Sequence, residues 1–177
     1  MTTRMCKYCS THNRSKARFC QQCGQPFPSG VEIFFSYAHG DEALRDRLAK
    51  HLSLLQRQGF VTLWHDRNIN AGTNWSNSID QHLQTAEVIL LMVSANFIAS
   101  DYCYSMEMQR AMDRQDREEA IVIPIILRPV DWKSAPFGKL QALPKDAKPI
   151  VTWSDVDQAL LNTAQGIRRA INDNYMP

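Results

Sequence analysis

Six consecutive apolar residues, Val88-Ile89-Leu90-Leu91-Met92-Val93, stand near the middle of the chain. A short run without any polar residue predicts a strand that is buried on both faces, as at the centre of a parallel sheet. Other apolar runs at 31–35, 60–64, 121–127 and 150–153 predict four more strands. Pro124 lies within the run at 121–127, and a residue without an N–H either argues against a strand there or places the strand near the edge of the sheet.

Helical patterns separate these strands. The first apolar helix face is formed by Leu44, Leu48, Leu52 and Leu55. We expect Asp41 to cap this helix and Gly59 to end it. Further helices are expected after Asn74, over 102–117, and after a capping motif at Ser154. Because strands and helices alternate, the sequence predicts an α/β domain with a flavodoxin-like, five-stranded parallel sheet and helices on both faces.

Polar and aromatic side chains follow three of the predicted strands. Ser36 and Tyr37 come after the first strand, Asp66 after the second and Ser94 after the third. In an open parallel sheet, ligands bind beyond the carboxyl ends of the strands. The sequence therefore predicts a ligand site at this edge.

Four of the five cysteines form two pairs, Cys6-x-x-Cys9 and Cys20-x-x-Cys23. Each pair fits a tight turn, and a hairpin between them can bring four thiolates around one tetrahedral Zn²⁺. Gly24 suits the sharp turn after the second pair. Two disulfides are the alternative, but they would require a secreted chain, and nothing in the sequence indicates secretion. The pattern resembles short zinc ribbons, whose metal is structural.

The composition changes at the end of this cysteine-rich segment. Residues 1–30 hold five basic residues and no acidic one, whereas 31–177 hold fifteen basic and eighteen acidic residues. We therefore expect a zinc ribbon at 1–27, a linker at 28–30 and the α/β domain at 31–177. The excess positive charge is too small to argue for nucleic-acid binding. Without a signal peptide or a membrane-spanning run, we expect a cytoplasmic protein.

Three motifs in the α/β segment resemble the TIR family over residues 31–171. The first is Phe34-Phe35-Ser36-Tyr37, at the exit of the first strand. The second is the loop Asp66-Arg67-Asn68-Ile69-Asn70-Ala71-Gly72, followed by Trp75. The third is Ser94-x-x-Phe97-x-x-Ser100-x-Tyr102-Cys103, followed by Glu107. The resemblance implies a TIR fold for this domain.

In catalytic TIR domains, a glutamate on the third helix is essential for cleaving NAD⁺ between ribose and nicotinamide, and Glu107 matches it. Many members carry an aromatic residue four positions earlier; here Cys103 is four and Tyr102 five positions earlier. The resemblance implies an NAD⁺ glycohydrolase, with a linear or a cyclised product, in immune or stress signalling of the bacterial type. It also implies self-association through TIR domains, and the ribbon is a candidate contact for a sensor domain or protein partner.

One carboxylate is chemically sufficient for this reaction. Nicotinamide leaves as a neutral molecule from a cationic pyridinium and needs no general acid, so only one of the two carboxylates of an ordinary glycosidase is required. A cleft-facing Glu107 can stabilise the cationic ribose by its charge or by binding the hydroxyls; the alternative is a solvated helix residue.

The other candidate substrate-binding residues have structural alternatives. Ser36 and Tyr37 are placed to line the pocket, although Tyr37 can also simply cover the strand end. Asp66 can hold ribose hydroxyls or cap its own loop. Trp75 can stack on an aromatic ring of the substrate or belong to the core. Cys103 fits a buried small residue on a helix.

Two other classes of function compete with the enzyme. One is a non-catalytic scaffold that works through TIR–TIR contacts, against which Glu107 argues. The other is a phospho-acceptor receiver domain of the same topology. That class needs an acidic pair after the first strand and an aspartate after the third, and this chain has Ser36-Tyr37 and Ser94 there. The sequence therefore excludes the receiver domain.

Overall fold

The structure is a computed structural model that describes residues 3–6, 8–14, 17, 20–24, 30–66 and 75–175. Its main sheet is built from four parallel strands in the order β4-β3-β5-β6. The strands are β3 (Val31–Ser36), β4 (Val61–Trp64), β5 (Val88–Val93) and β6 (Ile121–Ile126). All six residues of β5 are buried, and its neighbours β3 and β6 pair with it on either side. The prediction of a central apolar strand is confirmed.

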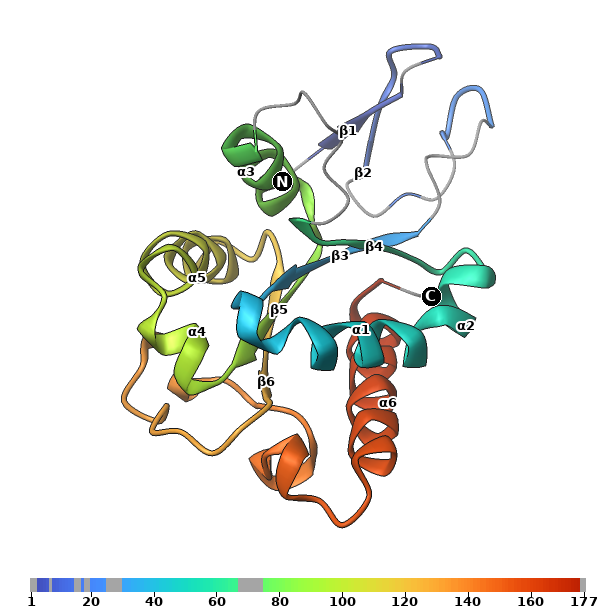
Figure 1. The fold of residues 1–177 in the computed structure, drawn as a ribbon. Coiled ribbons are helices and arrows are strands. Elements are labelled where there is room, and N and C mark those ends of the chain that lie inside the picture. The colour runs from blue at the N-terminus through green and yellow to red at the C-terminus, as the bar shows by residue number, and fades with distance from the viewer. Residues whose placement is uncertain are drawn as a thin grey trace.

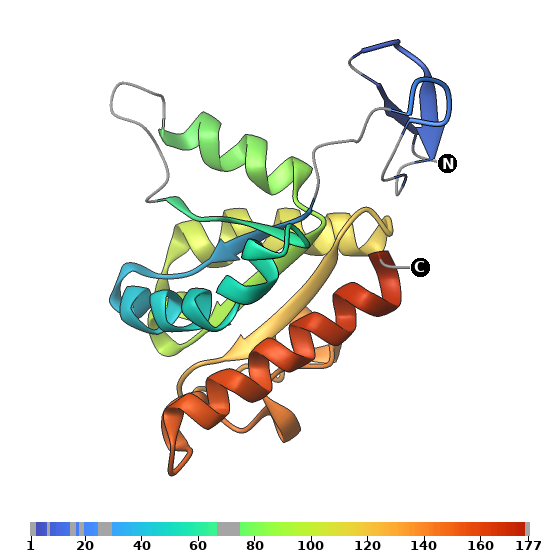
Figure 2. The ribbon, with the colours of Figure 1, turned by 90° about the vertical axis from the view of Figure 1, so that its right-hand side faces the viewer.

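Helices cover both faces of this sheet (Figure 1). One face is covered by α1 (Glu42–His51), α2 (Ser53–Arg57) and α6 (Val156–Tyr175). The other is covered by α3 (Trp75–Thr85), α4 (Ala95–Ala99), the π-helix η3 (Tyr102–Glu107) and α5 (Met108–Asp116). Figure 2 shows α6 and α3 on opposite sides of the sheet. Within the described residues, no helix is long and apolar enough to cross a membrane.

Alternate residues of each strand enter two separate cores. Phe35 and Leu90 pack with α1, α2 and α6, whereas Phe34 and Ile89 pack with α3 and α5. This alternation follows from the two-residue period of a strand. The four leucines predicted to share a helix face are all buried in the first core. Gly59 follows the helix with a φ of 74°, as its predicted terminating role requires.

The expected fifth strand is wrong. Residues 150–152 form a 3₁₀ helix, η6 (Ile150–Thr152), which follows η4 (Pro136–Lys139) and η5 (Lys145–Ala147) in the chain between β6 and α6. The outer edge of β6 is already occupied by Leu143, whose N–H donates to the Pro124 carbonyl and whose carbonyl accepts from Ile126, both at 2.8 Å. Pro124 therefore lies in the edge strand among the described residues, as its missing N–H suggested.

Asp41 does not cap α1, contrary to the prediction. It lies at the end of η1 (His39–Asp41) and is fully buried, and its side chain makes no cap hydrogen bond. Instead, its carboxylate accepts from the Ser94 hydroxyl and from Arg128 Nε at 2.9 Å. Ser94 also caps α4 by accepting from the N–H of Phe97 at 3.1 Å. These contacts tie the carboxyl ends of β3, β5 and β6 together, which fixes the edge where the site lies.

Candidate functional site: a pocket at the strand ends and a cysteine cluster

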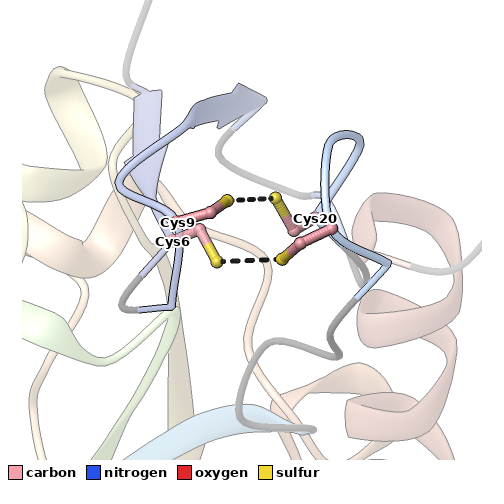
Figure 3. Close-up of side chains that lie close together, drawn as sticks. Cys6, Cys9 and Cys20 are labelled. Carbon is pink, nitrogen blue, oxygen red and sulfur yellow. Dashed lines mark hydrogen bonds between the residues drawn. The ribbon is translucent and has the colours of Figure 1, made fainter.

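The four predicted zinc ligands lie close together. Cys6 and Cys9 lie between β1 (Thr3–Met5) and β2 (His12–Arg14), whereas Cys20 and Cys23 follow β2. The four sulfur atoms all lie within 4.8 Å of one another. Figure 3 shows two sulfur pairs facing each other: Cys6 and Cys23 are 3.7 Å apart, and Cys9 and Cys20 are 3.5 Å apart. A disulfide needs about 2.05 Å, whereas tetrahedral Zn–S bonds of about 2.3 Å separate the sulfurs by about 3.8 Å. The residues therefore fit a metal ion better than two disulfides.

Neighbouring groups hold this cluster in shape. Gly24 has a φ of 68°, and its N–H donates to the Cys20 carbonyl at 2.9 Å. The amide of Asn13, which is buried, lies 3.6 Å from Cys20 Sγ, while its oxygen accepts from the N–H of Gln21. The sequence did not single out Asn13, because nothing local distinguishes it from a turn residue. Such contacts orient metal ligands.

The second site is a pocket of about 260 Å³ beyond the carboxyl ends of β3 and β4. Its wall contains three of the predicted residues, which are Tyr37, Asp66 and Glu107. Ser36 is fully buried, and its hydroxyl donates to Glu107 Oε2. Residues 67–74 of the predicted loop and the side chain of Trp75 lie outside the described residues. Three of the five candidates for catalysis and substrate binding therefore line the pocket, and a fourth, Ser36, contacts one of them from behind.

A π-helical turn determines where Glu107 lies. Within η3, hydrogen bonds join residues five apart, as between the Met108 N–H and the Cys103 carbonyl. Consequently, Tyr102 and Glu107, which are five positions apart, both reach the pocket. Cys103, four positions before Glu107, lines the pocket as well. π-turns of this kind occur frequently at functional sites.

Glu107 is buried, with 6% of its surface exposed, rather than open to a cleft. Burial raises the pKa of its carboxyl to about 8, the hydrogen bond from Ser36 opposes this, and the negative charges of Asp66 and Asp80 add to it. At neutral pH the free protein therefore holds a proton on Glu107. A cationic ligand beside it would favour the ionised form.

The opposite corner of the pocket is formed by Tyr37 and Asp66. The Tyr37 hydroxyl donates to Asp66 Oδ1, which links the ends of β3 and β4. Burial, followed by this contact with Asp66, raises the pKa of Tyr37 above its usual range. The phenol is thus a fixed hydrogen-bond donor at every physiological pH. Asp66 thus contacts Tyr37, while residues 67–74 of its own loop lie outside the described residues.

Aromatic residues that sequence reasoning did not assign to the site form the rest of the wall. Trp64 stacks on Phe34, with ring centroids 5.2 Å apart, and on His82 at 4.3 Å. Trp64, Phe34, Tyr102 and His39 line the pocket. Their position after the strands was the available signal, but which side chains turn inward depends on packing between distant elements. Such a wall suits a flat heteroaromatic ring.

Cys103 also lines the pocket and is buried, as expected. Its thiol lies 3.3 Å from the Tyr37 carbonyl, to which it donates. Burial raises the pKa of this thiol to about 11. A neutral thiol is a poor nucleophile, so the burial of Cys103 argues against a covalent role and for a place in the wall of the pocket.

Comparisons with known proteins agree with this architecture. The family model described as "TIR domain" matches residues 33–167. The uncharacterized protein y4lF of Sinorhizobium fredii is 59% identical over 138 residues, which span 78% of this chain and 43% of that protein. The chain thus spans less than half the length of that relative. Among solved structures, the TIR domain of the Toll-related receptor TRR-2 from Hydra magnipapillata is similar in fold, with a TM-score of 0.56, 18% identity, and coverage of 79% of this chain and 97% of that one.

Proposed function

We propose, because this chain belongs to the TIR domain family, that its α/β domain is an NAD⁺ glycohydrolase that cleaves the bond between nicotinamide and ribose. The family includes NAD⁺-cleaving enzymes and non-catalytic scaffolds. The observation that carries the proposal is Glu107, a buried carboxyl group in the wall of an aromatic pocket at the carboxyl edge of the sheet. A scaffold alone needs no carboxyl group there, since burying one costs stability.

The proposed reaction assigns a task to each side of the pocket. The aromatic wall around Trp64 holds the nicotinamide ring, and the ionised Glu107 stabilises the positive charge that develops on the ribose. Asp66, Tyr37 and Ser36 bind or orient the ribose hydroxyls, and Trp75 is the proposed stacking residue beyond them. Nicotinamide leaves neutral, so the wall need not supply a general acid.

The size of the pocket bears on where the rest of NAD⁺ binds. Its volume of about 260 Å³ lies below the roughly 300–1,000 Å³ typical of sites for drug-sized ligands. It can enclose the nicotinamide riboside half, and the adenosine half must lie outside it. We propose that self-association of the domain completes the binding surface and that the active form is an assembly.

The N-terminal segment has a separate proposed task. We assign 1–27 to a ribbon that binds one structural Zn²⁺ through Cys6, Cys9, Cys20 and Cys23, 28–30 to a linker and 31–177 to the catalytic domain. The sulfur spacing supports the metal. The ribbon is the proposed contact for a sensor or partner protein, and the cytoplasm is the proposed location, where thiols stay reduced.

Product analysis tests the proposed activity. The wild-type protein, at high concentration or with a crowding agent, is incubated with NAD⁺, and the products are separated by chromatography. We expect free nicotinamide together with ADP-ribose, linear or cyclised. Light scattering on the same sample reports whether the domains have associated. Intact NAD⁺ in an associated sample would reject the enzyme and favour the scaffold.

A further inference from the structure

Arg45 on α1 is the largest of the fully buried side chains among the described residues, and the proposed reaction leaves it unused. Only 1% of it is exposed. Its Nη2 contacts Glu42 at 3.3 Å and Asp46 at 2.9 Å. Its Nε and Nη1 are buried without a hydrogen-bond partner among the described residues. Burying a cation with two unsatisfied donors is costly, so packing alone does not explain why an arginine stands here.

The guanidinium lies directly against the polar corner of the pocket. Its carbon is 4.7 Å from the centroid of the Tyr37 ring, which is the geometry of a cation–π contact. The hydroxyl of the same ring donates to Asp66. His65, next to Asp66, is also affected: burial and the charge of Arg45 both lower its pKa. Arg45 therefore touches the corner from the side of α1 without lining the pocket.

We propose that Arg45 is a positioning residue that fixes the Tyr37 ring, and through it Asp66, for binding the ribose of the substrate. The proposal rests on the proposed function, because only a substrate gives this corner a task. Only Ala38 and the short η1 separate Tyr37 from the start of α1, so the contact relates the position of the helix to that of the pocket. Tyr37 cannot then turn away from Asp66 without losing the cation.

If the role of Arg45 were purely structural, its replacement would lower the stability of the fold. A positioning role does not require this loss. Replacing a buried, incompletely paired ion with an apolar residue of similar volume is often neutral or stabilising. The partners that would lose the ion, Glu42 and Asp46, have 31% and 53% of their side chains exposed and can be solvated. Arg45→Met should therefore keep the fold and lose the positioning, and the two effects can be measured separately.

The test compares Arg45→Met with Arg47→Met, which removes the same charge from the same helix at a side chain that is 43% exposed and paired with Asp157. We expect Arg45→Met to unfold at no lower urea concentration than the wild type. Its kcat/KM for NAD⁺ should fall by about tenfold or more, which corresponds to about 1.4 kcal/mol in the transition state. Arg47→Met should keep its kcat/KM.

Two further readouts separate positioning from a general loss of structure. In an Asp66→Asn background, Arg45→Met should cause little further loss, because both changes act on one corner. In protein labelled with 3-fluorotyrosine, the Tyr37 resonance, assigned with Tyr37→Phe, should shift in Arg45→Met and not in Arg47→Met. If Arg45→Met does not fold, Arg45→Lys, which keeps the charge but not the planar stacking, is judged by the same readouts.

An unchanged Tyr37 resonance, or losses that multiply independently in the Asp66→Asn background, would overturn the proposal. The fluorine measurement needs no catalysis. A wild-type protein that leaves NAD⁺ intact would therefore reject the proposed function, while the fluorine spectra would still decide whether Arg45 positions Tyr37.

Discussion

Glu107 combines a chemical role with a cost in stability. The sequence suggested a cleft-facing carboxylate with little influence on folding, but the side chain is buried against Ser36. Its pKa is about 8, against 4.5 for an exposed glutamate. A group that is unfavourable for folding and lies in a pocket is typical of an active site, where stability is given up for activity. The position could be predicted from the motif; the burial could not, because it depends on how η3 packs on β3.

The stability of Glu107→Gln should depend less on pH than that of the wild type. The folded protein keeps the Glu107 proton up to about pH 8, whereas the unfolded chain releases it near 4.5. Between these values the folded state binds more protons, so wild-type stability falls as pH rises and then levels off above 8. Glutamine has no such proton. The variant should be the more stable protein by on the order of a few kcal/mol at pH 8 and above, and near equal at pH 4.5.

Urea denaturation at a series of pH values measures this difference. Asp116→Asn is the control, since it removes an exposed carboxylate from the adjacent α5 and should leave the pH dependence unchanged. A wild type and a Glu107→Gln variant with parallel stability curves from pH 5 to 8 would contradict the burial of an uncharged Glu107.

At the scale of elements, strands were predictable where the local pattern decides the outcome. The four strands that form coincide with apolar runs such as Val88–Val93, whose composition predicts their burial. The segment expected to be a strand at 150–153 instead contains the 3₁₀ helix η6, and it is Leu143 that pairs with the edge of β6. The prediction that Asp41 caps a helix was wrong because its carboxylate binds Arg128, which is 87 residues away and has no local sequence signal. The π-turn of η3 was also not predictable, since it is set by tertiary packing. A local sequence pattern does not predict the structure where a residue distant in sequence binds the same groups.

The cysteine ribbon is an element whose fold should depend on its metal. Its four thiolates have the spacing of a zinc site. Within the described part, its apolar cluster contains only Cys6, Cys20 and Ala17, so little apart from the metal can stabilise the ribbon. Metal analysis should give about one zinc per chain. Cys20→Ser should lose the metal and the fold of the ribbon but leave 31–177 folded, whereas His12→Ala should keep the metal because four cysteines complete the shell.

NMR spectra of the ribbon, recorded together with the bound-metal content, test this prediction. Well-dispersed ribbon signals in zinc-free protein would contradict it.

A chain that starts at Gly30 should retain the intrinsic activity, because every residue assigned to the pocket lies beyond that point.

At the scale of the whole molecule, parallel topology brings the site together. The ends of β3 and β4 supply Tyr37 and Asp66, and the π-helix η3 supplies Tyr102 and Glu107. Residues 70 positions apart, Tyr37 and Glu107, therefore share one pocket. The sequence predicted this edge from topology alone. The sequence did not predict the small volume of the pocket. Because of this volume, the proposed reaction requires an assembly of domains. The chain spans only 43% of the length of its relative y4lF.

The most direct test of the central claim is the rate of nicotinamide release by assembled Glu107→Gln, measured beside the wild type and Asp116→Asn at pH 8.5, above the pKa of about 8 to which burial raises the wild-type carboxyl. Glutamine keeps the size of the side chain and removes its charge. We expect the variant to be slower by on the order of 100-fold or more, the effect of losing one preorganised electrostatic group, with Asp116→Asn at the wild-type rate. Release by Glu107→Gln at the wild-type rate would contradict the assignment of this residue.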